Sequence, residues 1–95
     1  MTEPEPRKCV QLHIQGRVTG VGYRWWFQQQ AQAAHLTGYV RNVGEREVEA
    51  YLCGPADRVD QLVERAAVGP PAARPTSVRA VPAPERDFGG FRVFG

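Results

Sequence analysis

The chain has 95 residues, of which 42% are hydrophobic and 23% charged, and its formal net charge is +2. A chain of this length supports one small hydrophobic core, so we expect a single domain over residues 8–95. The composition excludes disordered and fibrous classes. No apolar run approaches the roughly 18 residues that a membrane-spanning helix needs. Residues 1–7 lack the order of a secretory signal, so we expect a disordered or extended tail and a cytoplasmic location.

The charged residues are spread along the chain. Eleven arginines and one lysine form no block, which argues against a dedicated nucleic-acid-binding surface. A small anionic ligand needs only one or two of these side chains. The charge pattern is therefore compatible with a small anionic ligand.

The chain has two cysteines, Cys9 and Cys53, and both fall inside strand-like segments. A bridge between them is possible, but without an export signal we expect free, buried or half-buried thiols. With His13 and His35 they offer four candidate metal ligands, yet no pair has a recognised short ligand spacing. We therefore predict neither a metal site nor a cofactor.

Hydrophobic periodicity predicts a strand and then a helix in the first third of the chain. Residues 8–15 alternate, with Val10, Leu12 and Ile14 on one face, as in a half-buried strand. Residues 23–36 contain no Gly or Pro, and their apolar stripe has helical spacing. The stripe comprises Tyr23, Phe27, Ala31 and Ala34.

The remaining segments complete a recognisable order. Strands are predicted at 38–43 and 47–53 around a hairpin at 44–46, and Gly54-Pro55 opens a second helix, with Pro55 near its first turn. Its apolar face comprises Val59, Leu62, Val63 and Ala66. Residues 76–81 and 91–94 are the last two strand candidates. This order predicts an α+β protein of the ferredoxin-like, split βαβ plan: an antiparallel sheet with two helices on one face. Residues 91–94 would add a fifth strand or edge segment.

A glycine-rich segment lies between the first strand and the first helix. Gly16, Gly20 and Gly22 permit backbone conformations that other residues disfavour. Backbone N–H groups and the helix N-terminus can converge there on an anion, and Arg24 can close over it. The segment matches neither a Walker nor a dinucleotide fingerprint, so a purely structural turn is the alternative.

Two segments carry a family resemblance. The stretch Gly16-Arg-Val-Thr-Gly-Val-Gly-Tyr-Arg24, followed by Leu36-Thr-Gly-Tyr-Val-Arg-Asn42, resembles the two signature segments of the acylphosphatase family. Val48-Glu49 and Gly54-Pro55 also fit, and the resemblance spans residues 10–94.

The resemblance implies a metal-independent hydrolase that cleaves the carboxyl-phosphate anhydride of acyl phosphates by direct attack of water. It implies that Arg24 and Asn42 are the catalytic residues, with Arg24 on the phosphate and Asn42 on the attacking water. It further implies that the substrate phosphate, or a phosphate or sulfate ion, is bound by the loop residues Thr19, Gly20, Val21, Gly22, Tyr23 and Arg24.

The residue types suit this chemistry. Phosphoryl transfer needs mainly positioning and charge stabilisation, which backbone amides and one arginine supply. The carboxylate leaving group is good, so an asparagine can orient water without acting as a base. The only serine, Ser77, falls on a predicted strand far from the loop. We expect His13 and His35 to be surface or packing residues.

The chain departs from the family pattern at two places. Thr19 stands where glutamine is common, which puts loop rigidity and rate in doubt. Gly44-Glu45-Arg46-Glu47 replaces the usual Asp-Gly turn, and a shifted turn can alter how Asn42 faces the water.

Two other functions remain open from the sequence. One is a non-catalytic phosphate-binding regulatory module of the same fold. The other is a nucleic-acid-binding sheet, for which Trp25, Trp26 and Phe27 would stack on bases, although such a cluster is more often core or rim. We expect a monomer that acts on a small molecule, with no nucleic-acid or membrane partner. No pocket for the acyl group is identifiable.

Overall fold

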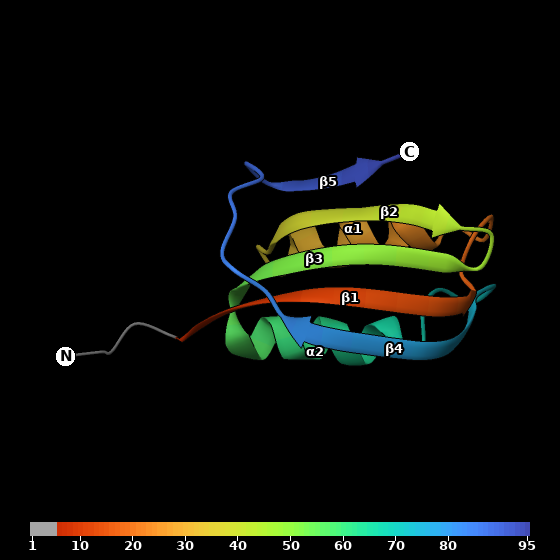
Figure 1. Cartoon of the computed structure of the whole chain (residues 1–95), viewed down its shortest axis with the longest axis horizontal. Helices are drawn as coiled ribbons and strands as arrows, with labels where there is room; N and C mark the ends of the chain where they lie inside the picture. Colours follow the sequence, from red (N-terminus) through yellow and green to blue (C-terminus); the bar gives the residue numbers. More distant parts are fainter. Residues whose placement is uncertain (1–5) are drawn as a thin grey trace.

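The computed structural model describes residues 6–95, which form a single sheet covered on one face by two helices (Figure 1). In chain order the elements are β1 (Arg7–Arg17), α1 (Tyr23–Ala33), β2 (Thr37–Gly44), β3 (Glu47–Pro55), α2 (Ala56–Ala66), β4 (Arg74–Pro82) and β5 (Phe91–Phe94).

The sheet has the strand order β4-β1-β3-β2-β5. The first four strands pair antiparallel, and β5 adds to the edge as a parallel neighbour of β2. The predicted α+β class and ferredoxin-like plan are therefore confirmed. The fifth strand extends the plan, and its parallel pairing makes the sheet mixed.

Strand β1 shows why the sequence alternates. Val10, Leu12 and Ile14 are buried against the helices, whereas Gln11 and His13 between them are half-buried on the other face. The strand is longer than the 8–15 predicted. Residues 1–5 of the predicted tail lie outside the described residues, and the domain boundary at residue 8 stays a prediction.

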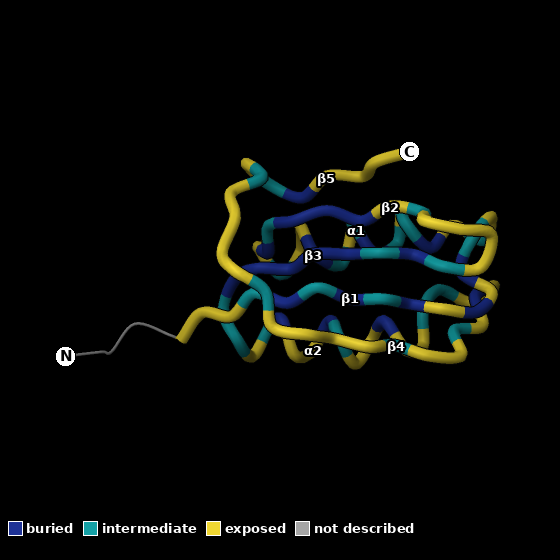
Figure 2. Tube along the Cα trace, viewed as in Figure 1, coloured by how far each residue is buried: buried dark blue, intermediate teal, exposed yellow. Residues whose placement is uncertain are grey.

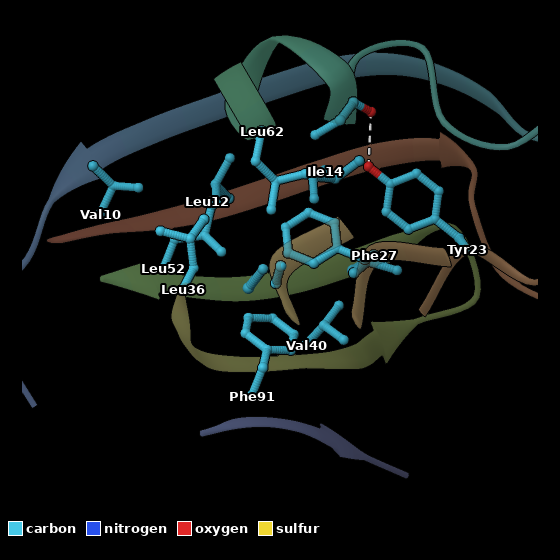
Figure 3. Close-up of a cluster of buried hydrophobic side chains, with 14 of the residues drawn as sticks. Val10, Leu12, Ile14, Tyr23, Phe27, Leu36, Val40, Leu52, Leu62 and Phe91 are labelled. Atoms are coloured by element: carbon cyan, nitrogen blue, oxygen red, sulfur yellow. Dashed lines mark hydrogen bonds between the residues drawn. The ribbon is translucent and has the colours of Figure 1, made fainter. Parts of the chain in front are cut away.

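The main core lies between the sheet and the helices (Figure 3). Tyr23 and Phe27 of α1 and Leu62 of α2 point into it, as their helical spacing predicted. The Tyr23 hydroxyl donates a hydrogen bond of 2.7 Å to the carbonyl of Ala66. This bond joins the start of α1 to the end of α2.

Helix α1 ends earlier than predicted, at Ala33 instead of residue 36. His35 adopts a φ of 58°, in the left-handed region, and the Leu36 N–H donates to the Ala31 carbonyl. A left-handed residue is a common helix stop, because it turns the chain while satisfying the last carbonyls. The sequence disguises this stop because histidine replaces the usual glycine.

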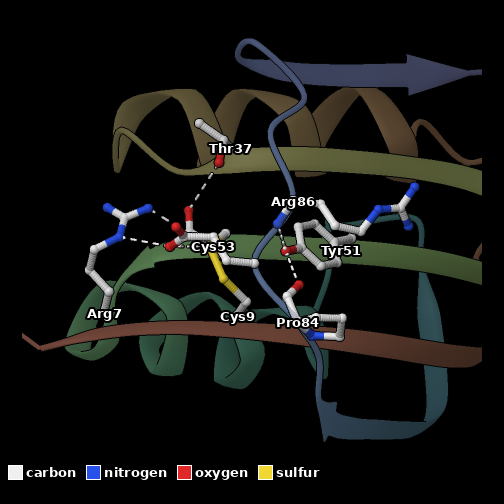
Figure 4. The surroundings of a disulfide bond; sticks show 8 residues. Arg7, Cys9, Thr37, Tyr51, Cys53, Pro84 and Arg86 are labelled. Carbon is white, nitrogen blue, oxygen red and sulfur yellow. Dashed lines mark hydrogen bonds and ion pairs between the residues drawn. A yellow bond between two sulfur atoms is a disulfide. The ribbon is translucent and has the colours of Figure 1, made fainter.

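The expectation of free thiols is wrong for this structure, because Cys9 and Cys53 form a disulfide (Figure 4). The two residues lie directly opposite each other in the β1–β3 ladder, with their Cα atoms 4.1 Å apart. Their separation of 44 positions in the sequence conceals this contact. Only the strand register brings them together.

The sheet face away from the helices carries a smaller apolar cluster of Tyr39, Tyr51 and Cys53. The segment between β4 and β5 crosses this face (Figure 1) and packs Phe88 against Tyr39 and Tyr51, with ring centroids 5.2 Å apart in each pair. The Tyr51 hydroxyl donates to the Pro84 carbonyl at 2.6 Å (Figure 4). The centre of the sheet is consequently buried on both faces, whereas β4 is largely exposed (Figure 2).

Candidate active site

The glycine-rich loop lies at the end of the sheet where β1 and β2 both terminate (Figure 1). Residues 18–22 connect β1 to α1, and Arg24 is the second residue of the helix. Asn42 is near the end of β2, two residues before Gly44. The fold therefore places both predicted catalytic residues at the same end of the sheet.

The loop backbone is arranged to offer N–H donors. Gly20 and Gly22 have φ values of 70° and 78°, which glycine adopts without strain. Gly22 is the N-cap residue of α1, and no side chain caps the helix. Among the described residues, no N–H group from Thr19 to Trp25 donates to a protein acceptor. These donors and the positive end of the helix dipole suit an anion.

The loop borders a cavity of about 340 Å³. Gly20, Gly22, Tyr23 and Arg24 line it, so four of the predicted phosphate-binding residues lie around one space. Its other lining residues are Val18, Trp25, Gln28 and Val93.

The other two predicted loop residues do not line the cavity. Val21 packs against the main core, and the Thr19 hydroxyl donates a hydrogen bond to the Glu45 carbonyl in the β2–β3 turn. Any contribution of these two residues to phosphate binding would come through their backbone N–H groups.

Arg24 is held by the C-terminal strand. Its Nη1 donates a hydrogen bond of 2.9 Å to the Phe94 carbonyl. No carboxylate within residues 6–95 forms an ion pair with Arg24. A guanidinium has five N–H donors. One strand therefore orients the side chain, while its charge and remaining donors stay available for an anion.

Asn42 has an unusual environment. It lies on the helix-covered face, like Val40 two residues before it, and does not line the cavity. Its Oδ1 is the only buried side-chain oxygen or nitrogen in the described chain without a hydrogen-bond partner. Buried polar atoms are normally paired, and an exception often marks a binding or catalytic role or a water.

The turn after Asn42 is irregular, as the missing Asp-Gly turn suggested. Asn42 pairs with Val48 of β3, but the register shifts between Asn42 and Gly44. The strand stays regular through Asn42 itself. The irregularity therefore starts just beyond the predicted water-positioning residue.

Tyr23 lines the cavity, but its side chain belongs to the core. Its ring is 1% exposed and packs in the core, where its hydroxyl bonds Ala66. Burial raises the pKa of the Tyr23 hydroxyl well above its ordinary value. The phenol therefore stays protonated at neutral pH and is a structural group that anchors the start of α1.

The histidines and the serine lie away from the cavity. His13 is half-buried on the face opposite the helices, with Nδ1 3.8 Å from Glu47 Oε1. His35 is exposed just after α1, and Ser77 is exposed on β4. None of the three lines the loop cavity.

In the described part of the chain, one group of side chains has ligand atoms close enough together to hold a metal ion. It comprises Cys9, Cys53 and Glu85. The two sulfurs are bonded to each other. Zinc binds the deprotonated thiolate, which neither sulfur offers in the bridged state. This cluster therefore does not form a thiolate metal site while the bridge is present.

Sequence reasoning missed two contacts of the site, the Phe94 carbonyl on Arg24 and the Glu45 carbonyl on Thr19. Both acceptors are backbone atoms, and they lie 70 and 26 positions away along the chain. No residue type signals such a contact, since every residue carries a carbonyl.

Comparison with known proteins agrees with the geometry. The family model for acylphosphatase matches residues 10–93. The chain belongs to the acylphosphatase family. The enzyme class predicted from the sequence, acylphosphatase, is confirmed by this match and by the relatives that follow.

Individual relatives cover nearly the whole chain. An acylphosphatase of Azoarcus sp. strain BH72 is 42% identical over 92 residues, 96% of this chain and 94% of that protein. One from Caldivirga maquilingensis is 45% identical over 86 residues, 88% of this chain and 90% of that protein. The structure of an acylphosphatase from Coxiella burnetii superposes with a TM-score of 0.89 at 32% identity, covering 93% of each chain.

The two helices were compared with what a membrane span requires. Neither α1 nor α2 is long and apolar enough to cross a bilayer.

Proposed function

We propose that this protein hydrolyses acyl phosphates to a carboxylate and inorganic phosphate, without a metal ion, by direct attack of water on phosphorus. One observation carries the proposal: the loop residues Gly20, Gly22 and Tyr23, whose N–H groups are free, line the same cavity as Arg24. Such an arrangement is complementary to a phosphoryl group, whose charge lies on three outer oxygens.

Phosphate binding is assigned to the loop. The N–H groups of Thr19 to Arg24 donate to the phosphoryl oxygens, and the free donors of Arg24 add a full positive charge. These groups are already in place before the substrate binds, because Gly20 and Gly22 shape the loop and Phe94 holds the arginine. Donors fixed in advance need no reorganisation as charge develops in the transition state.

Water positioning is assigned to Asn42. Its unpartnered Oδ1 accepts a hydrogen bond from the attacking water. The water oxygen forms a bond to phosphorus, the bond between phosphorus and the acyl oxygen breaks, and the carboxylate leaves. The proton of the water passes to the phosphate product. An amide does not titrate here, so its role is orientation.

In this proposal the positive charge at the site comes from the protein itself. Arg24 and the helix N-terminus supply the electrostatic stabilisation that a divalent cation gives in many phosphoryl-transfer enzymes. The proposal therefore needs no bound cation.

The deciding experiment is hydrolysis of benzoyl phosphate by the purified protein, with and without EDTA, and with p-nitrophenyl phosphate as a monoester control. We expect turnover of the anhydride that EDTA leaves unchanged, and little turnover of the monoester. Loss of activity in EDTA would contradict metal independence. Tight binding of phosphate with no turnover would instead identify a phosphate-binding regulatory module.

Partners and location remain predictions. We propose a monomer with a small-molecule substrate, a phosphate or sulfate ion as a competing ligand of the loop, and no nucleic-acid or membrane partner. A cytoplasmic location is also proposed, although the Cys9–Cys53 disulfide is more typical of oxidising compartments. Sedimentation and cell fractionation test these points.

A further inference from the structure

The loop cavity has a second wall that phosphate binding does not use. Trp25 and Gln28 of α1 form one side of it, and Val93 of β5 forms the other. No acidic side chain of the described chain lines the cavity. An indole ring and a valine side chain thus lie next to the loop and Arg24, with no negative charge beside them.

Trp25 is not needed for the core. Its side chain is 68% exposed, and among the described residues it forms no aromatic pair. The neighbouring Trp26 behaves differently, since it packs against the core with its ring 5.4 Å from that of Tyr23. Folding therefore accounts for Trp26 and leaves Trp25 available to a ligand.

The opposite wall is fixed to the helix by contacts on both sides of Val93. The Gln28 Nε2 donates a 3.2 Å hydrogen bond to the Phe91 carbonyl, and Arg24 donates to the Phe94 carbonyl. The Phe91 ring is buried against Phe27, with centroids 5.7 Å apart. These contacts fix α1 and β5 relative to each other, so the cavity between them has the character of a preformed ligand pocket.

We propose that Trp25 and Val93 form the binding subsite for the acyl group, and that it selects acyl phosphates with aromatic or bulky hydrocarbon acyl groups over acetyl phosphate. This inference rests on the proposed function, because it needs the phosphoryl group in the loop. The cavity of about 340 Å³ is of the size that small-molecule sites have. An aromatic acyl group would stack on the Trp25 ring and exclude water from Val93.

The first test compares two substrates in the wild type and in single variants. Trp25→Ala and Val93→Ser remove the proposed wall. Gln29→Ala, an exposed change on the same helix, controls for the first. Val81→Ser controls for the second, because Val81 is 39% exposed against 37% for Val93 and lies on β4 at the opposite edge of the sheet.

We expect the ratio of kcat/KM for benzoyl phosphate to that for acetyl phosphate to fall about 10-fold in Trp25→Ala, within the range that contacts in an apolar pocket provide. A smaller fall is expected in Val93→Ser, and Trp25→Phe should retain most of the ratio. Both controls should keep the wild-type ratio. Equal losses on the two substrates in Trp25→Ala would overturn the subsite and leave Trp25 as a group that only supports the loop.

The second test separates the subsite from the proposed hydrolysis. The Kd values of 2-oxo-2-phenylethylphosphonate and 2-oxopropylphosphonate are measured by calorimetry; in each a methylene replaces the scissile oxygen. We expect the phenyl compound to bind more tightly, and Trp25→Ala to remove that preference while the Kd of inorganic phosphate is kept. If the protein hydrolyses neither substrate but shows this preference, the proposed function fails and the subsite stands. Equal Kd values for the two phosphonates in the wild type would overturn the subsite.

Discussion

The hydroxyl of Thr19 donates a hydrogen bond to the backbone carbonyl of Glu45. The contact joins the glycine-rich loop to the β2–β3 turn, and the Gly16 N–H adds a second link of 3.0 Å to the Arg46 carbonyl. Thr19 and this turn are the two places where the chain departs from the family pattern. The two departures therefore meet in one contact, which couples the loop to the strand that carries Asn42.

Removing the Thr19 hydroxyl should loosen that coupling. We expect Thr19→Val to lower kcat for benzoyl phosphate about 10-fold, since small misplacements of positioning groups reduce rate strongly. The loss of one hydrogen bond should lower the free energy of unfolding by about 1 kcal/mol. Urea denaturation and steady-state kinetics measure the two effects. Thr19→Ser keeps the hydroxyl and should behave like wild type, and wild-type kcat in Thr19→Val would refute the coupling.

Replacing Arg24 should affect catalysis far more than folding. We expect Arg24→Ala to lower kcat/KM by about 10²–10³, the usual cost of removing one transition-state donor. Arg24→Lys should recover only part of this loss, because an ammonium group lacks the planar fork of guanidinium. Arg79→Ala is the control, because Arg79 is an exposed arginine on β4 that does not line the loop cavity. Comparable activity in the Arg24 and Arg79 variants would remove Arg24 from the mechanism.

Replacing Asn42 should have different effects on stability and on activity. Its buried, unpartnered Oδ1 carries a desolvation cost of about 1–3 kcal/mol. We therefore expect Asn42→Ala to keep or raise Tm while kcat for benzoyl phosphate falls about 10²-fold. Scanning calorimetry and kinetics on the same sample provide the comparison. A clear drop in Tm with unchanged kcat would make Asn42 a structural residue.

Glu49 should make the free energy of unfolding depend on pH in the acid range. Burial raises the pKa of its carboxyl, but hydrogen bonds from Tyr39 and Arg41 and the positive charges of Arg41 and His13 outweigh this and hold the pKa below its ordinary value. Burial and the bond to Glu49 also raise the pKa of Tyr39 to about 12. A carboxyl whose pKa is lowered in the folded state stabilises the fold at pH values above its unfolded pKa of about 4.3. This stabilisation is lost as pH falls through the folded pKa.

The matching variant is Glu49→Gln. We expect it to lower the free energy of unfolding at pH 7 by about 1 kcal/mol. The value is small because Arg41 is half-exposed and solvent screens its ion pair with Glu49. The difference between variant and wild type should shrink as pH falls through the folded pKa of Glu49, because the carboxylate is then being protonated in the wild type. Denaturation at a series of pH values checks this, and a difference that stays constant from pH 7 to 2 would exclude the carboxylate as its source.

The Cys9–Cys53 bridge is open to a direct chemical test. We expect Ellman's reagent to find no free thiol in the denatured, unreduced protein and two after reduction. Because the bridge closes a loop of 44 positions, the double variant Cys9→Ser, Cys53→Ser should lose about 2–4 kcal/mol of unfolding free energy. Neither cysteine lines the loop cavity, so the double variant should retain the wild-type kcat/KM. Two reactive thiols in the unreduced protein would show that the bridge is absent in solution.

The sequence by itself determined the features that depend on neighbours along the chain. The alternation of Val10, Leu12 and Ile14 predicted β1 and its buried face, and the spacing of Tyr23 and Phe27 predicted α1 and its buried stripe. These patterns are local because a strand repeats every two residues and a helix every 3.6. The glycine loop and its arginine are also contiguous, so the family motif could be recognised without a structure.

Only the tertiary structure decided the features that join distant segments. The β1–β3 register paired Cys9 with Cys53 and overturned the expectation of free thiols. The addition of β5 beside β2 brought the Phe94 carbonyl to Arg24 and Val93 to the cavity of Trp25. Backbone carbonyls and exposed side chains carry no signal of their partners in the sequence. Their positions depend on how the sheet is assembled, and the proposed acyl subsite became visible only once it was.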